Sequence, residues 1–208
     1  MTFPRLYAIA DAALLQSRGV GLAAYAAELQ AAGVTLLQYR DKSGSVREVL
    51  NAMESLRPLR SAENFRLILN DRADLALLAD ADGVHVGQQD LAPADARRIV
   101  GPSRWVGVST HNPAQLEEAD ATDCDYIAYG PIFATASKQN PDPVVGLAGL
   151  QQARRLTRKP LVAIGGITIA NARAVLDAGA DSVAVISALL PVEGSPRQAA
   201  EDFLAILR

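Results

Sequence analysis

The sequence predicts an α/β protein that folds as a single-domain (β/α)8 barrel of the TIM type. Short β-branched or aliphatic runs alternate with longer segments rich in Ala, Leu, Arg and Glu, and eight such pairs follow one another along the 208 residues. Polar residues gather directly after the apolar runs, as they do at the carboxyl ends of barrel strands. No linker rich in Pro, Gly or Ser divides the chain, so we expect residues 1–208 to form one domain.

The predicted strands are β-branched or aliphatic runs at residues 6–10, 35–39, 66–69, 83–86, 105–108, 126–129, 161–164 and 182–186. The predicted helices fill the gaps and include residues 22–32, 46–59, 92–100, 149–157, 170–178 and 197–207. Gly33, Gly83 and Gly179 stand between a helical pattern and a strand, where glycine can take the left-handed conformation that ends a helix. An open, doubly wound sheet is the alternative, but no Gly-x-Gly-x-x-Gly follows the first strand.

The composition excludes several classes of partner. The net charge is −3 and no basic cluster is present, so we expect no nucleic-acid partner. The longest apolar run, residues 183–192, is too short to cross a membrane, and the first ten residues lack the pattern of a secretory signal. The single Cys124 excludes an internal disulfide. We therefore expect a cytoplasmic protein that binds small molecules, and no pattern predicts its oligomeric state.

A first anion site is predicted after the second strand. Gln38, Arg40 and Lys42 are spaced by two, which places all three side chains on one face if the strand continues. Arginine binds an anion as a bidentate fork and lysine binds it as a point charge. The alternative is a solvated strand end with an Asp41–Lys42 surface pair.

Two carboxylates follow the next two strands. Asp71 and Asp90 would repel one another at close range unless a proton or cation lay between them. Mg²⁺ prefers hard oxygen ligands and is bound by one or two carboxylates together with substrate phosphates and water. The alternative is that both aspartates cap helices, those beginning at Ala73 and near Ala92. The pairing on adjacent strands favours the metal.

A second anion site is predicted where the last two strands end. Gly165 and Gly166 allow backbone N–H groups to approach a phosphate, and Ser187 follows the last strand. A tight turn with Ser187 as a helix cap is the alternative. Residues 130–146 form a long loop that carries Thr135, Ser137 and Lys138, and we interpret it as a binding loop rather than a surface insert.

The histidines and the cysteine are weaker candidates. We interpret His85, inside a strand, as a satisfied core histidine, and His111 as the residue that opens a helix. Cys124 is expected to be a small buried residue. No Ser/His/Asp set or cysteine-nucleophile motif is visible, which argues against acyl-enzyme chemistry.

Six stretches in consecutive order resemble those of the thiamine-phosphate synthase family. They are QYRDK at 38–42, LNDR at 69–72, GVHVGQQD at 83–90, GVSTH at 107–111, YGPIFATASK at 129–138 and AIGGI at 163–167. The resemblance covers most of the chain. The departures are Ser137, where the family usually has threonine, and Tyr39, where an aliphatic residue is commoner; neither removes a proposed ligand.

The resemblance implies a Mg²⁺-dependent transferase that joins 4-amino-2-methyl-5-hydroxymethylpyrimidine diphosphate to 4-methyl-5-(2-hydroxyethyl)thiazole phosphate and releases diphosphate. The residues it implies for the pyrimidine diphosphate are Gln38, Arg40, Lys42, Asn70 and Lys138. Asp71 and Asp90 would hold one Mg²⁺ per subunit, and Ser109 would stand near the reacting groups. The residues implied for the thiazole phosphate and neighbouring phosphoryl oxygens are Thr135, Ser137, Gly166, Ile186 and Ser187.

The implied mechanism is dissociative. Diphosphate leaves a pyrimidinylmethyl cation, which the thiazole nitrogen captures, so the enzyme mainly neutralises and positions the leaving group. Arg40, Lys42, Ser109 and Lys138 would be the catalytic residues. Two alternatives are a related thiazole tautomerase, which has a histidine in place of Pro131, and a non-catalytic sensor of thiazole or thiamine phosphate.

Overall fold

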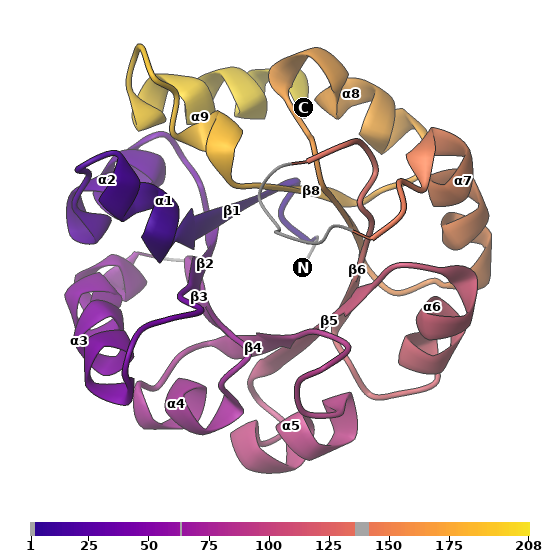
Figure 1. The fold of residues 1–208 in the computed structure, drawn as a ribbon, viewed down its shortest axis with the longest axis horizontal. Helices are drawn as coiled ribbons and strands as arrows, with labels where there is room; N and C mark the ends of the chain where they lie inside the picture. Colours follow the sequence, from indigo (N-terminus) through magenta and orange to yellow (C-terminus); the bar gives the residue numbers. More distant parts are fainter. Residues whose placement is uncertain (1–2, 63, 136–141) are drawn as a thin grey trace.

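The computed structural model describes residues 3–62, 64–135 and 142–208, and it contains the predicted barrel (Figure 1). Eight parallel strands pair in chain order, and β8 pairs with β1 to close the ring. The strands are β1 (Leu6–Asp11), β2 (Leu36–Arg40), β3 (Arg66–Asn70), β4 (Gly83–Val86), β5 (Trp105–Thr110), β6 (Tyr126–Tyr129), β7 (Leu161–Ile164) and β8 (Ser182–Val185). The prediction of a (β/α)8 barrel is confirmed, and the open-sheet alternative is wrong.

Helices surround the ring of strands and connect each strand to the next (Figure 1). They are α1 (Ala12–Ser17), α2 (Leu22–Ala31), α3 (Val46–Leu56), α4 (Ala73–Leu78), α5 (Pro93–Val100), α6 (Pro113–Asp120), α7 (Gly146–Leu156), α8 (Ile169–Asp177) and α9 (Pro196–Ile206), with 3-10 turns η1 (Arg57–Ser61) and η2 (Ser187–Leu189). The helix predicted at 46–59 ends at Leu56, because Pro58 cannot continue the α-helical hydrogen bonds. Among the described residues, no helix is long and apolar enough to cross a membrane.

Strand residues alternate between two cores, because successive side chains point to opposite faces. On β1, Tyr7 and Ile9 belong to the cluster inside the barrel, whereas Leu6, Ala8 and Ala10 belong to the cluster between the strands and the helices. Both faces of the strands are therefore buried, which explains why their sequences are almost continuously apolar.

Three aspartates link the amino ends of neighbouring strands by hydrogen bonds. Each lies directly before an even-numbered strand and accepts the N–H of a residue near the start of the preceding strand, and an arginine binds each of them. The contacts are Leu67 N–Asp82 at 2.8 Å with Arg60, Val106 N–Asp125 at 2.7 Å with Arg97, and Leu161 N–Asp181 at 2.8 Å with Arg154. These contacts stabilise the end of the barrel opposite to the carboxyl ends of the strands.

The helix-ending role predicted for glycine holds at two of the three positions. Gly33 and Gly179 have φ angles of 99° and 111°, the left-handed conformation expected there. Gly83 instead lies within β4, and Asp80 takes the positive φ before it. A Cβ at Gly83 would lie 2.4 Å from the carbonyl oxygen of Trp105, so this glycine is required for the close approach of β4 and β5.

Candidate functional site

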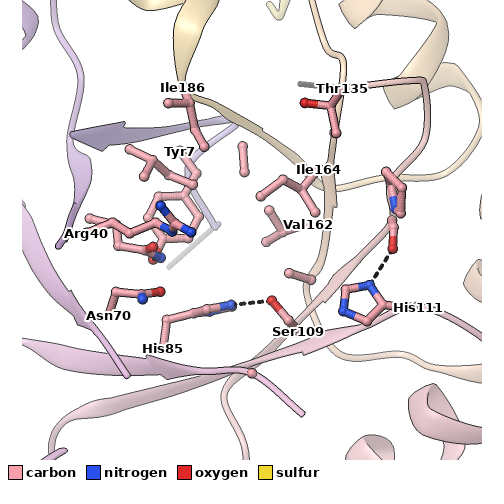
Figure 2. Close-up of a pocket in the computed structure, with 18 of the residues that line it drawn as sticks. Tyr7, Arg40, Asn70, His85, Ser109, His111, Thr135, Val162, Ile164 and Ile186 are labelled. Carbon is pink, nitrogen blue, oxygen red and sulfur yellow. Dashed lines mark hydrogen bonds between the residues drawn. The ribbon is translucent and has the colours of Figure 1, made fainter. Parts of the chain in front are cut away.

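A cavity of about 570 Å³ opens at the carboxyl ends of the strands (Figure 2). Every described residue of the predicted site lines it: Gln38, Arg40, Lys42, Asn70, Asp71, Asp90, Ser109, Thr135, Gly166, Ile186 and Ser187. The remaining two, Ser137 and Lys138, lie outside the described residues. Residues up to 149 positions apart along the sequence, Gln38 and Ser187, therefore share one space.

Arg40 is held at the cavity by an aspartate that sequence reasoning missed. Asp11 ends β1 directly beside Arg40, which ends β2. Its carboxylate accepts a hydrogen bond from Nη1 of Arg40 and another, at 3.0 Å, from the N–H of Leu14, which caps α1. The side chains of Arg40 and Asp11 are only 20% and 12% exposed, so solvent screens this ion pair less than a surface pair. The signal in the sequence was an acidic residue at the end of an apolar strand.

Lys42 and Asp71 form the second ion pair of this wall. Nζ of Lys42 lies 2.5 Å from Oδ2 of Asp71. Asp41 instead accepts the N–H groups of Ser43 at 3.0 Å and Gly44 at 2.8 Å. The alternative of an Asp41–Lys42 surface pair is therefore wrong.

Asp71 sits in an environment that disfavours its negative charge. Burial raises the pKa of its carboxyl group, the nearby Asp90 carboxylate raises it further, and the hydrogen bond from Lys42 opposes both. Asp90 accepts the N–H of Gly87 at 2.8 Å. The capping alternative is wrong for both aspartates, because the cap positions of α4 and α5 are Arg72 and Ala92.

The chemistry of these two aspartates fits a divalent cation. They offer hard oxygen ligands, and a cation between them would offset the burial and the repulsion from Asp90 that raise the pKa of Asp71. Within the described ranges, no group of three His, Cys, Asp or Glu side chains could complete a metal site. Two carboxylates are compatible with Mg²⁺, which commonly completes its coordination with substrate phosphate and water.

Asn70 supplies a hydrogen-bond donor without a partner. The residue is 9% exposed, and its side chain lines the cavity beside Arg40 and His85 (Figure 2). Nδ2 of Asn70 is buried and makes no hydrogen bond to any residue that the structure describes. A buried donor left unsatisfied costs about 1–3 kcal/mol, which a ligand oxygen would recover.

The opposite wall, from β6 to β8, is built from glycines and small polar side chains. Gly165 and Gly166 have φ angles of 100° and 64°, and a Cβ on Gly166 would lie 2.5 Å from the carbonyl oxygen of Ala134. Only glycine allows the two loops to approach so closely. Ser187 is the first residue of η2 and the N-cap position is occupied by Ile186, so the capping alternative is wrong.

Both histidines line the cavity, His85 near Asn70 and His111 on the other side of Ser109 (Figure 2). Nδ1 of His111 lies 2.6 Å from the carbonyl oxygen of Gly130, and Asn112, not His111, caps α6. His85 is buried and bonded through both ring nitrogens, as expected for a satisfied core histidine, yet it also lines the cavity and contacts Ser109.

Cys124 lies away from the cavity. It is 4% exposed, its thiol donates to the carbonyl oxygen of Ala119 at 3.3 Å, and burial raises the pKa of the thiol. The prediction of a small buried residue is confirmed by this burial. A thiol with a raised pKa is also a poor nucleophile.

The family profile, the curated relatives and a solved structure at 33% identity indicate the same family. The sequence profile of the family described as thiamine monophosphate synthase matches residues 6–189. A thiamine-phosphate synthase of Koribacter versatilis is 57% identical over 209 residues, which cover 100% of this chain and 97% of the relative. One from Chloroflexus aurantiacus is 43% identical and covers 91% and 86%. A solved thiamine phosphate pyrophosphorylase from Pyrococcus furiosus superposes with a TM-score of 0.86 at 33% identity and covers 98% and 95%.

Proposed function

The chain belongs to the thiamine monophosphate synthase family, and we propose that it joins hydroxymethylpyrimidine diphosphate to hydroxyethylthiazole phosphate, with release of diphosphate. The reaction breaks the bond between the pyrimidinylmethyl carbon and the diphosphate oxygen, and the electron pair leaves with diphosphate. The thiazole nitrogen then donates its lone pair to the carbon and becomes the quaternary nitrogen of thiamine phosphate.

One observation carries the proposal: a single cavity has two polar ends of different chemistry. The end at β2 to β4 combines Arg40 and Lys42 with two aspartates, as a highly charged diphosphate with a cation requires. The end at β7 and β8 offers glycine backbone and a hydroxyl, as a single phosphate requires. Two phosphorylated substrates bound in this way would meet within the cavity.

The leaving diphosphate is stabilised by cations and by donors that are already in place. Arg40, held by Asp11, and Lys42 bring positive charge, and Nδ2 of Asn70 brings a buried hydrogen-bond donor. Gln38 and Ser109 also line the cavity, and we assign them to the pyrimidine substrate. Preorganised donors of this kind typically contribute about 10²–10³ in kcat each. Lys138 is assigned to the diphosphate from the family resemblance, as a residue outside the described ranges.

We assign one Mg²⁺ per subunit to Asp71 and Asp90, whose mutual repulsion supports a cation between them. When bound, Mg²⁺ supplies charge neutralisation for the diphosphate oxygens. Lys42 contacts the Asp71 carboxylate, so its charge also offsets the negative charge that Asp71 presents to an incoming anion.

The thiazole phosphate is assigned to the backbone at Gly166 and Ile186 and to the hydroxyls of Thr135 and Ser187, which line the other end. Ser137 is added to this set from the family resemblance. The tautomerase alternative is not favoured, because the relatives are thiamine-phosphate synthases and Pro131 offers no acid or base.

The test is a chromatographic assay of the purified protein with both substrates and Mg²⁺, beside the same mixture with a chelator. We expect thiamine phosphate only with Mg²⁺ and both substrates. Binding of the thiazole phosphate without any product would favour a sensor, and tautomer exchange of a lone thiazole would favour the tautomerase. Equal turnover with the chelator would contradict the Mg²⁺ assignment but not the reaction.

A further inference from the structure

A continuous chain of hydrogen bonds crosses the interior of the barrel along the inner wall of the cavity. Nε2 of Gln38 donates to the hydroxyl of Tyr7 at 2.8 Å, and this hydroxyl lies 2.8 Å from that of Tyr126. The Tyr126 hydroxyl lies 3.1 Å from Nδ1 of His85, whose Nε2 lies 2.8 Å from the hydroxyl of Ser109. Four of the five side chains are nearly inaccessible to solvent, and the chain ends at Ser109, the most exposed of its members on the cavity wall (Figure 2).

The barrel leaves room for this chain by means of a glycine. His85, Gly107 and Tyr126 are register partners on β4, β5 and β6, so their positions share the inner face. A Cβ on Gly107 would lie 2.0 Å from Cζ of Tyr126 and 2.4 Å from its hydroxyl oxygen. The phenol therefore leans across β5, and its ring lies over that of His85 with the centroids 5.5 Å apart. Without this glycine, the two side chains could not meet.

Hydrogen-bond counting gives the chain a direction. An amide nitrogen only donates, so the Tyr7 oxygen accepts from Gln38 and its O–H donates to the oxygen of Tyr126. Tyr126 then donates to Nδ1 of His85, which leaves the imidazole proton on Nε2. Burial raises the pKa of both tyrosines, so both hydroxyls keep the protons that this direction requires.

We propose that Gln38, Tyr7 and Tyr126 are positioning residues that hold His85 as the neutral Nε2–H tautomer and thereby make Ser109 a hydrogen-bond donor to the ligand. Because Nε2–H donates to the Ser109 oxygen, the serine proton turns away from His85 toward the cavity. The reverse direction, with the Gln38 amide turned over, would make Ser109 donate to His85 and leave only its lone pairs for the ligand. The functional consequence rests on the proposed function: the acceptor is an atom of the pyrimidine diphosphate.

The tautomer can be measured on the ligand-free enzyme, independently of activity. The sequence has two histidines, and ¹⁵N-imidazole NMR of the whole protein distinguishes protonation at Nδ1 from protonation at Nε2. His111 is an internal contrast, since its Nδ1 faces a carbonyl oxygen and must carry a proton to bond it. The resonances that disappear in His111→Asn belong to His111, and those that remain belong to His85. We expect His85 to be the neutral Nε2–H form, and an Nδ1–H or doubly protonated His85 would overturn the proposal.

Gln38→Glu tests the direction itself. A carboxylate only accepts, so Tyr7 would donate to it, and the chain would reverse to give Nδ1–H on His85. Persistence of the Nε2–H form in a folded Gln38→Glu protein would show that this end of the chain does not set the tautomer.

Tyr126→Phe tests the effect on catalysis, with Tyr129→Phe on the same strand as its control. Tyr129 belongs to the core between the strands and the helices, and its hydroxyl makes no hydrogen bond within the described part of the chain. We expect Tyr126→Phe to give a mixture of His85 tautomers and to lower kcat about tenfold, and Tyr129→Phe to do neither. In a Ser109→Ala background, Tyr126→Phe should have no further effect on kcat. An undiminished effect there would overturn the proposal, whereas a wild-type enzyme that makes no thiamine phosphate would refute only the proposed function.

Discussion

Asp11 has two separable tasks, and two substitutions distinguish them. Its carboxylate caps α1 and binds Arg40. Asparagine caps a helix as well as aspartate does, but it lacks the charge that holds the guanidinium. Asp11→Ala should therefore lose both contributions, and Asp11→Asn only the second.

The magnitudes follow from the burial of the pair. Loss of the cap costs about 1 kcal/mol, which lowers the Tm of a protein of this size by about 2–4 °C. A hydrogen bond to a charged group contributes about 1.5–3 kcal/mol, and the 12% exposure of Asp11 argues against much solvent screening. If the orientation of Arg40 depends on this bond, kcat/KM for the pyrimidine diphosphate should fall roughly 10- to 100-fold in both variants.

The assays are thermal unfolding and steady-state kinetics with varied pyrimidine diphosphate. We expect Asp11→Asn to unfold about 2–4 °C above Asp11→Ala, since only the asparagine retains the cap, and to lose activity like Asp11→Ala. Wild-type kcat/KM in Asp11→Asn would refute the dependence of Arg40 on Asp11.

Three further predictions follow from other contacts. Because the folded pKa of Asp71 is raised, the folded state binds more protons than the unfolded state above the ordinary carboxyl pKa of 3.8, and Asp71 lowers stability as pH rises through that window. Asp71→Asn, which also suits the φ of 63°, should unfold at a higher temperature than the ligand-free wild type at pH 7, and the difference should be smaller near pH 4. The variant should also need a higher Mg²⁺ concentration for activity. A Tm below that of the wild type at pH 7 would contradict this prediction. Asp125→Ala leaves the buried Val106 N–H without its acceptor and should cost about 2–3 kcal/mol in denaturant unfolding, whereas Asp95→Ala, in an exposed pair with Arg98, should cost under about 0.5 kcal/mol. Ser187→Ala should mainly raise the KM for thiazole phosphate about tenfold, and a fall in kcat alone would contradict its assignment to that phosphate.

The sequence predicted the barrel because its local patterns repeat. Each strand is an apolar run, and polar residues follow the runs at the carboxyl ends of the strands. This pattern predicts that Arg40, Asn70 and Asp71 lie together, as they do in the cavity. The short α1 was not predicted, since a six-residue helix carries little periodicity. The role of Gly83 was mistaken because a helix-ending glycine and a glycine required for strand packing have the same local sequence.

The contacts that link distant strands could not be predicted. Asp11 meets Arg40 only because β1 lies beside β2, and Tyr126 reaches His85 only because Gly107 lies between them in register. Lateral register is set by closure of the barrel and not by any local pattern. For this reason, the sequence patterns indicate the residues at the cavity mouth but not the two tyrosines of the hydrogen-bond chain inside the barrel.

The most direct test of the central claim is a crystal structure with thiamine phosphate, diphosphate and Mg²⁺ bound. We expect diphosphate against Arg40, Lys42 and Asn70, Mg²⁺ between diphosphate and the carboxylates of Asp71 and Asp90, and the thiazole phosphate at Gly166 and Ser187. Diphosphate at the β7–β8 end, or a metal that touches neither aspartate, would contradict the assignment of the two ends of the cavity.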